Sequence, residues 1–410
     1  MTQAGGEYLK GLDGIRGLAM ATVVLTHMHL VGVGWITIQI FFVLSGFLIT
    51  RILLSMREQH GLGDYLKIFY ARRTLRIFPI YYLFLLTLWA VSFFVPELDR
   101  ERRQIPYALA YVWNWYAITD HGGLAPELEH FWSLAVEEQF YLLWPLLLFF
   151  ARGTAFWKIA IGIVVAGPLI RLGCALAWPQ LDGVLPNAHK AIYQMSTTHL
   201  DAFAVGALLC YVIRQPWSYR FTGTHLMLGV VAAWLLGSLA SGFGFGRGGP
   251  YRIPLNLGYP IHMADNWQFV WGYSVINLLA AGLILLVAQG RFANALFMHP
   301  FVRRMGVISY AAYIFHLGIV YLLVPPIKQV QAALGSVYLG TWLCAPLVLA
   351  LVFGLAELSY RFFESRFLVM KDRQFGRAPV ETAAPSGTTT ADAGRPLQSG
   401  TLLIDPRTSR

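Results

Sequence analysis

Residues 35–50 read WITIQIFFVLSGFLIT, sixteen positions without a charged side chain. The stretch continues past Arg51 to about residue 55, and comparable apolar stretches recur along most of the 410-residue chain. A helix needs about 20 mostly apolar residues to cross the roughly 30 Å hydrocarbon core of a bilayer. The stretch therefore predicts one membrane-spanning helix among several, and the predicted fold class is an all-α polytopic integral membrane protein.

Composition and charge support the same class. Of all residues, 57% are hydrophobic and 13% are charged, whereas a soluble domain carries about 25% charged residues. The net charge of +10 at pH 7 does not indicate nucleic-acid binding, because the basic residues cluster between apolar segments, as they do in the cytoplasmic loops of membrane proteins. Orientation in the lipid bilayer and contact with anionic lipid account for this charge.

The apolar stretches predict ten membrane spans. They lie at about 12–30, 35–55, 76–96, 131–150, 156–177, 199–213, 225–242, 268–289, 305–324 and 338–360. An even number puts both termini on one side, and 23 of the 31 Lys and Arg residues fall on that side. Because cytoplasmic loops carry the excess of positive charge, the predicted topology is N-in and C-in. The first span lacks a small-residue cleavage site and is predicted to be a retained helix rather than a signal peptide.

The apolar pattern ends near residue 368. Residues 1–368 are predicted to form the membrane domain, and residues 369–410, rich in Ala, Pro, Gly, Ser and Thr, a disordered cytoplasmic tail. The chain contains no Walker motif and no dinucleotide-binding fingerprint, so ATP and NAD lack support. Cys174, Cys210 and Cys344 lie in apolar segments without metal or disulfide spacing and are interpreted as small packing residues. No metal cofactor is predicted.

Two ionisable residues of the first span share one helix face. An ionisable side chain inside a membrane is costly and is a functional candidate for that reason. Arg16 and His27 are eleven residues apart, about three turns plus 20°, so their side chains lie on one face about 16 Å apart. With the N-terminus inside, Arg16 lies near the cytoplasm and His27 in the outer half. A purely structural pair, a snorkelling arginine and a hydrogen-bonded histidine, is the alternative.

Two adjacent carboxylates lie about two turns into the fourth span. Glu137 and Glu138 point about 100° apart on a helix, so we expect one to face a cavity and the other to pair with a neighbouring helix. A carboxylate beside an imidazole orients it and raises its basicity for general-base work. His316 in the ninth span lies at a comparable depth, where a structural hydrogen-bonding role is slightly favoured.

A basic cluster, Arg72, Arg73 and Arg76, marks the cytoplasmic start of the third span. Arginine forks match the geometry of phosphate, so the cluster is a candidate site for a phosphorylated cofactor. Contact with lipid headgroups is the alternative. An extended pantetheine arm could bridge the distance from this cluster to a base in the outer half of the membrane, which suggests an acyl-CoA, although composition and spacing do not identify the donor.

A series of short motifs follows one order along the chain. They are residues 12–19 with His27, residues 41–49, Arg73 and Arg76 before Pro79 and Tyr81, residues 132–141, residues 200–202, Ser309 and Tyr310 with His316, and Glu364. Together they resemble membrane acyltransferase family three, the group containing bacterial O-antigen and macrolide acyltransferases, over about residues 9–368. The chain departs from the pattern at Gln39, where many members carry an aspartate.

The resemblance implies a ten-helix protein of the bacterial inner membrane. Such a protein takes an acyl group, with acetyl the expected one, from cytoplasmic acyl-CoA and delivers it to a hydroxyl of a carbohydrate or related acceptor. Many relatives also carry an appended periplasmic hydrolase-like domain, and this chain resembles the stand-alone type. The matched motifs add a supporting set of candidates: Glu138, His316, Ser45, Trp132 and Asp201.

The resulting hypothesis is an O-acyltransferase. It assigns a catalytic set of His27, Glu137 and Arg16 and an acyl-CoA-binding set of Arg72, Arg73 and Arg76. His27 acts as general base on the acceptor or carries the acyl group covalently, and Glu137 orients or charges it. The alternative is a transporter that uses the same buried charges as a proton relay. A transporter would release no free CoA thiol.

The acceptor stays open between a glycan and a glycosylated natural product. Aromatic residues of the long outer loop at 97–130 could stack on a sugar, although interfacial belts of Trp and Tyr are the commoner explanation. These residues are Tyr107, Tyr111, Trp113, Trp115 and Tyr116.

Overall fold

The computed structural model describes residues 4–119, 123–177, 188–241, 258–259 and 267–375, with side chains from Lys10 onward. Within these ranges the chain is helical and has no β-strand, which confirms the all-α class. The long helices are α1 (Ala4–His27), α2 (Gly34–Gln59), α3 (Leu62–Val91), α6 (Phe131–Phe150), α7 (Thr154–Ala177), α9 (Leu200–Val212), α10 (Gly223–Ala240), α11 (Gln268–Ala288), α14 (Ser309–Leu334) and α15 (Val337–Ser359).

Shorter elements connect the long helices. On the segment between α3 and α6 they are η1 (Pro96–Leu98), α4 (Asp99–Leu109), α5 (Trp113–Ala117) and η2 (Pro126–Leu128). Further along the chain they are α8 (Ala188–Gln194), η4 (Ser196–His199), η5 (Pro216–Arg220), α12 (Asn294–Phe297), α13 (Pro300–Val307), the π-helical turn η8 (Tyr360–Glu364) and α16 (Ser365–Phe375). Residues 369–375, assigned to the tail from sequence, are thus helical, and residues 376–410 lie outside the described residues.

Eight segments in the described part of the chain are long and apolar enough to cross a membrane. They are α2, α3, Pro126–Phe150, α7, α10, α11, α14 and Val337–Phe375. The other two predicted spans correspond to α1, which carries Lys10, Asp13 and Arg16, and to α9, which has 13 residues. The protein is therefore polytopic, whereas the number ten and the N-in topology remain predictions.

The segment between the predicted spans 35–55 and 76–96 is mostly helical rather than a loop. α2 continues to Gln59 and α3 begins at Leu62. These polar helix ends extend beyond the apolar stretch because they pack on the end of α6: the Tyr65 hydroxyl donates to the Pro145 carbonyl oxygen at 3.1 Å, and Arg57 donates to that of Leu148 at 2.9 Å. The arginine cluster therefore lies inside α3 rather than at its start.

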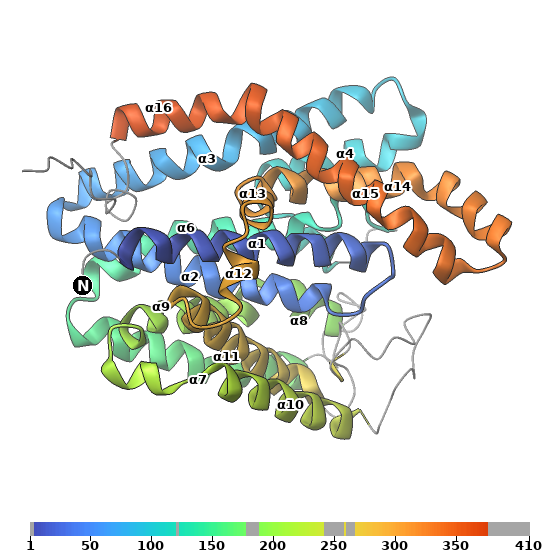
Figure 1. Ribbon diagram of the computed structural model, residues 1–410. Helices are drawn as coiled ribbons and strands as arrows, with labels where there is room; N and C mark the ends of the chain where they lie inside the picture. The colour runs from blue at the N-terminus through green and yellow to red at the C-terminus, as the bar shows by residue number, and fades with distance from the viewer. Residues whose placement is uncertain (1–3, 120–122, 178–187, 242–257, 260–266, 376–410) are drawn as a thin grey trace, which may run out of the picture.

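The helices α1 and α2 run through the middle of the molecule (Figure 1). In that view α7, α9, α10 and α11 lie on one side of them, and α3, α14, α15 and α16 lie on the other. Contacts join α1 to α13, α2 to α9, and α14 to α15 most extensively. The central pair therefore contributes residues to both halves, and motifs far apart in sequence meet around it.

Close helix crossings depend on glycine. A Cβ atom on Gly46 of α2 would lie 2.1 Å from the Phe203 carbonyl oxygen of α9, and one on Gly206 would lie 2.0 Å from the Val43 carbonyl oxygen. The α1–α13 crossing is equally tight at Gly306. Small residues let membrane helices approach closely and pack without a hydrophobic driving force between them.

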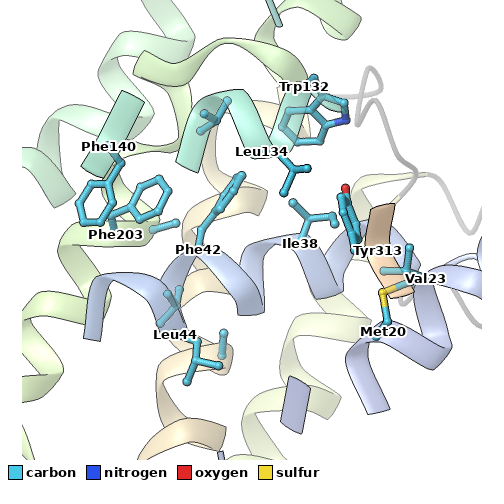
Figure 2. Packing of buried hydrophobic residues seen from close by; sticks show 14 of the residues in the cluster. Met20, Val23, Ile38, Phe42, Leu44, Trp132, Leu134, Phe140, Phe203 and Tyr313 are labelled. Carbon is cyan, nitrogen blue, oxygen red and sulfur yellow. The ribbon is translucent and has the colours of Figure 1, made fainter. Parts of the chain in front are cut away.

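Aromatic side chains fill the space beside the α2–α9 crossing. The rings of Phe140 and Phe203 stack at 4.0 Å, and Phe42 lies 4.9 Å from Phe203 (Figure 2). Figure 2 also shows Tyr313 of α14 beside Ile38 of α2. Through this packed layer, the side of α2 that carries Ile38 and Phe42 faces α6 and α14.

Candidate active site

A cavity with about 770 Å³ of empty space, part of it open to solvent, lies between α1, α2, α3, α6 and α14. Its polar and charged lining consists of Arg16, Ser45, Arg73, Arg76, Ser133, Glu137, Tyr141, Ser309, Tyr310 and Tyr313. Its apolar lining consists of Ile38, Phe41, Phe42, Ile77, Leu134 and Val307. Three helices that are distant in sequence thus bring their predicted charged residues to one space.

Glu137 is the acidic residue of this lining. Its carboxylate accepts hydrogen bonds from the hydroxyls of Ser45 on α2 and Tyr141 one turn further along α6. The two hydroxyl oxygens lie 3.4 Å apart. The adjacent Glu138 does not line the cavity, as expected for neighbours that point about 100° apart on a helix.

Three arginines give the cavity a net positive charge. The Arg73 guanidinium lies 5.0 Å from the ring centre of Tyr141, within the range of a cation–π contact. Arg16 pairs with Asp13 one turn earlier on α1 at 3.4 Å, and Arg76 completes the set. A cavity with three guanidinium groups and a carboxylate suits an anionic ligand.

A smaller cavity, with about 420 Å³ of empty space that includes open solvent, shares Arg73 and Arg76 with the first. Arg72 lines only the smaller cavity and pairs with Asp372 of α16 at 3.8 Å. Along α2 the two cavities extend from Met56 to Ile38, about 27 Å at 1.5 Å per residue. That length approaches the thickness of the hydrocarbon core.

His27 lies apart from Glu137, in a group of three histidines. Its ring centre is 5.0 Å from that of His316, which is 4.7 Å from that of His130. His27 is not among the cavity-lining residues, and the described hydrogen bonds of Glu137 go to Ser45 and Tyr141. The structure therefore brings Glu137 together with the arginines, and His27 together with His316, rather than forming the expected His27–Glu137 pair.

Tyr313 separates the cavity from the histidines. It lines the cavity, and its ring centre lies 5.2 Å from that of His316 and 5.1 Å from that of His130. Its hydroxyl shares a 2.6 Å hydrogen bond with Ser133 and reaches the His130 carbonyl oxygen at 3.2 Å. The end of the cavity at Tyr313 is thus one side chain away from the histidine group.

The tautomer of His316 follows from its hydrogen bond. Its Nδ1 lies 2.6 Å from the carbonyl oxygen of Tyr313, and a carbonyl oxygen only accepts, so Nδ1 carries the proton. In the neutral ring Nε2 then holds the lone pair, and it is buried without a hydrogen-bond partner among the described residues. The lone pair of His316 is therefore on Nε2, in a ring whose centre lies 5.0 Å from that of His27.

Two supporting candidates have structural roles. Asp201 accepts from Arg171 at 2.9 and 3.1 Å and from Ser274 at 2.8 Å, and both members of the ion pair are buried. Arg171 also donates to the Thr198 carbonyl oxygen at 2.7 Å. Trp132 packs on Tyr193, with ring centres 4.5 Å apart. Neither Asp201 nor Trp132 lines the cavity.

Gln39, the departure from the family pattern, is fully buried. Its side-chain amide lies 3.0 Å from Nδ1 of His199, whose Nε2 lies 2.7 Å from the Tyr193 carbonyl oxygen. Nε2 therefore donates to that carbonyl, and Nδ1 accepts from the amide. A neutral amide–imidazole pair occupies this place, outside the cavity lining.

The outer loop folds onto α3. The Tyr81 hydroxyl donates to the Ala108 carbonyl oxygen at 2.6 Å. The side-chain amide of Gln104 donates to the Gly123 carbonyl oxygen at 2.9 Å, which attaches the segment before η2 to α4. The carboxyl group of buried Glu101 hydrogen-bonds with that of Glu127, and burial together with this bond raises the pKa of Glu101 to about 7. Glu101 therefore keeps its proton to a higher pH than an exposed carboxyl group does.

The aromatic residues at 97–130 stack on rings of this segment and of α3. Tyr111 lies 4.3 Å from Tyr81, and Tyr107 lies 4.2 Å from Tyr116, each measured between ring centres. Trp113 is fully buried. These residues hold the loop together, which accounts for their presence without a sugar.

Several residues of the site were not predicted. Ser133 and Tyr141 belong to a motif that was recognised, but their contacts with Tyr313 and Glu137 depend on helix packing. Tyr313 lies one turn before His316, which is a usable signal. The remaining three residues are His130, Tyr310 and Lys371, and Lys371 follows the end of the apolar pattern.

No group of three or more His, Cys, Asp or Glu side chains suited to a metal ion occurs in the described ranges. The three cysteines are free thiols.

Comparison with known proteins gives one family. A family model described as "Acyltransferase domain" matches residues 9–361. Among similar proteins, "O-acetyltransferase OatA" of Staphylococcus aureus (strain MRSA252) is 29% identical over 90% of this chain and 60% of its own length. "Putative O-acetyltransferase SACOL0978" of Staphylococcus aureus (strain COL) is 26% identical over 88% of this chain and 57% of its own length. The chain thus spans less than two thirds of these relatives, and no solved structure matches it significantly.

Proposed function

Because the chain belongs to the acyltransferase domain family, we propose that it is a membrane O-acyltransferase. It transfers an acyl group, acetyl by analogy with the names of its relatives, from cytoplasmic acyl-CoA to a hydroxyl of a glycan or glycosylated natural product. The observation that carries the proposal is the pair of neighbouring cavities that share Arg73 and Arg76 in their linings.

The donor is proposed from charge and length. CoA carries its phosphates at one end and its thioester at the other, joined by the slender pantetheine arm. Cationic side chains surround the smaller cavity, and the larger cavity leads from them along α2 toward Ile38. Arginine binds phosphate through paired hydrogen bonds. We therefore assign the phosphates to Arg72, Arg73 and Arg76, with the thioester extending toward Glu137.

The chemistry requires a group that first accepts and then returns a proton. The acceptor oxygen attacks the thioester carbonyl carbon, its proton passes to a base, the carbon–sulfur bond breaks, and the protonated base returns this proton to the CoA sulfur. His27 is assigned as the base, in contact with His316, whose Nε2 can receive the proton. Arg16, together with Glu137, sets the charge around the thioester.

Two routes satisfy these assignments. In direct transfer the acceptor hydroxyl meets the thioester at the outer end of the cavity, near Tyr313. In the two-step route the acyl group forms a covalent bond to His27 with release of CoA, and the acceptor hydroxyl then displaces the imidazole. An acyl-enzyme trapped in the absence of acceptor identifies the second route.

The test is release of free thiol from acetyl-CoA by purified protein in lipid nanodiscs. The wild type is compared with His27→Ala, with a pool of glycan and natural-product acceptors added to both. Thiol release that depends on His27 is expected. Normal transfer by His27→Ala would refute the assignment of the base. Folded wild-type protein that releases no thiol with any acyl-CoA and acceptor would instead favour a transporter.

A further inference from the structure

A buried lysine lies beside the arginine cluster, at the end of the two cavities that is proposed to face the cytoplasm. Lys371 belongs to α16, beyond the span predicted at residues 338–360, and its side chain is 8% exposed. It lines the smaller cavity together with Arg72, Arg73 and Arg76. Burying an ammonium group is costly unless anions compensate for the lost water. This position calls for an anionic ligand as well as protein partners.

The helix that carries Lys371 lies directly against the arginine cluster. α16 runs beside α3, as Figure 1 shows at the upper edge of the molecule. Arg72 donates to the Phe375 carbonyl oxygen at 3.4 Å and approaches the Asp372 carboxylate at 3.8 Å. Lys371 approaches the same carboxylate at 3.3 Å. One carboxylate thus serves two cations at the wall of the cavity.

The lining of the smaller cavity is strongly cationic. Four of its seven described lining residues are Lys or Arg and the others are Ile52, Met56 and Phe69. The acidic Asp372, which pairs with Lys371 and Arg72, is not among the lining residues. Apolar residues beside a group of cations suit a phosphorylated ligand that also has a flat or hydrophobic part.

The order of the phosphates along CoA, counted from the thioester, matches the order of the cationic residues from the larger cavity to the smaller one. The diphosphate follows the pantetheine arm, and the ribose 3′-phosphate lies further from the thioester. Arg73 and Arg76 line both cavities, whereas Arg72 and Lys371 line only the smaller one. With the thioester toward Glu137, the diphosphate falls at the shared arginines and the 3′-phosphate at Arg72 and Lys371.

We infer that Lys371 and Arg72 form a subsite for the ribose 3′-phosphate of the acyl-CoA donor, with α16 as its wall. The inference rests on the proposed function and adds a residue and a specificity to it. Arg72 supplies a guanidinium fork and Lys371 a point charge, the two ways in which proteins hold phosphate. Asp372 is the counter-ion that both cations retain in the absence of the donor.

The test compares acetyl-CoA with 3′-dephospho-acetyl-CoA, in which a hydroxyl replaces the phosphate. Dissociation constants of both are measured for the wild type and Lys371→Gln in nanodiscs of phosphatidylcholine, so that no anionic lipid competes. We expect the wild type to bind acetyl-CoA about tenfold to a hundredfold more tightly than the dephospho compound, as for lost charged hydrogen bonds. In Lys371→Gln this preference should fall toward unity, with little change for the dephospho compound.

Two variants control for charge and folding. Lys67→Gln removes the same charge from an exposed position on α3 and should leave the preference unchanged. Lys371→Arg keeps the charge and should keep most of the preference. A repeat with phosphatidylglycerol in the nanodiscs tests the other source of phosphate, a lipid headgroup.

Three results would overturn the inference. The first is a wild type that binds both compounds equally, which needs no variant to interpret. The second is Lys371→Gln that weakens both compounds by the same factor. The third is an effect of Lys371→Gln confined to bound phosphatidylglycerol, which would assign the subsite to lipid. A folded wild type that binds neither compound would overturn the proposed donor itself, which distinguishes the two failures.

Discussion

The ring of His27 lies 5.0 Å from that of His316, and the two residues come from α1 and α14, which are almost 290 positions apart in sequence. His316 donates from Nδ1 to the carbonyl of Tyr313, which leaves Nε2 as an acceptor. The proposed base therefore has a second imidazole beside it that can take up a proton. Glu137, by contrast, is bonded to Ser45 and Tyr141 in the adjacent cavity.

We expect His316→Ala to lower kcat for acyl transfer about 100-fold and to leave the KM for acetyl-CoA nearly unchanged. The reason is that a positioned proton acceptor contributes roughly 10²–10⁴-fold to a rate without contacting the donor. Steady-state thiol release measures both constants. Exposed His299 is the matched control, and His299→Ala should keep the wild-type kcat. A variant changed in KM alone would contradict the relay.

The adjacent carboxylates allow a paired comparison. Glu137→Gln removes the negative charge that faces the arginines of the cavity, while Glu138→Gln changes a residue outside the lining. We expect the first substitution to lower kcat about 100-fold, the scale of one lost electrostatic contact in a water-poor site. The second should stay within a few-fold of the wild type in the same assay. Equal losses in both variants would show that cavity lining does not distinguish them.

Much of the fold was predictable because the bilayer imposes a simple rule. Apolar stretches such as residues 35–50 must form helices whose backbone groups bond within the segment. The helical course of residues 51–76 was missed because its polar surface resembles a loop. Its packing on α6 through Tyr65 and Arg57 depends on residues about 80 to 94 positions away. The polarity of residues 51–76 alone does not predict these contacts with α6.

The site was predicted in its parts but not in its grouping. Helix periodicity separates Glu137 from Glu138 correctly, because both lie on one helix of known geometry. Whether His27 contacts Glu137 depends on how α1, α6 and α14 pack. The spacing of residues within one helix does not predict this packing. Asp201 was selected by its motif, although in the structure it pairs with Arg171. A buried charged residue in a motif is expected to matter, but its burial does not show whether it acts in catalysis or stabilises the fold.

The Arg171–Asp201 pair predicts a stability effect. Both side chains are buried, so Asp201→Leu leaves an uncompensated guanidinium among α7, α9 and α11. Removing one partner of such a pair costs about 3–5 kcal/mol. Thermal unfolding in detergent should show a large fall in Tm for Asp201→Leu or Arg171→Met. The double variant should recover part of this loss, because no unpaired charge remains, and a double variant worse than both singles would argue against it.

The α2–α9 crossing predicts that Gly46→Ala is destabilising. The added methyl group would approach the Phe203 carbonyl oxygen to 2.1 Å, so the helices must separate. Overpacking of this kind typically costs about 1–3 kcal/mol. Gly173 on α7 has open space at its Cβ position, and Gly173→Ala should be neutral or slightly stabilising. Comparing the two Tm shifts separates helix contact from helix propensity.

The Glu101–Glu127 pair predicts that the outer loop is less stable at higher pH. Burial and the hydrogen bond to Glu127 raise the pKa of Glu101 to about 7 from an ordinary value of 4.5. A raised pKa means that the folded state binds the proton more tightly. The stabilisation is therefore complete below about pH 4.5 and is lost as pH rises through about 7. Each pKa unit corresponds to about 1.4 kcal/mol, so the loss is at most about 3 kcal/mol.

Glu101→Gln tests this pH dependence because an amide cannot titrate. Relative to the wild type, its Tm should rise as pH increases from 5 to 8, and hydrogen exchange in α4 should slow in the same direction. The comparison uses the difference between two proteins, since other groups titrate equally in both. Glu97→Gln, an exposed carboxylate on η1, should show no such trend. If the difference between Glu101→Gln and the wild type stays constant from pH 5 to 8, then the proton on Glu101 does not hold the loop against α3.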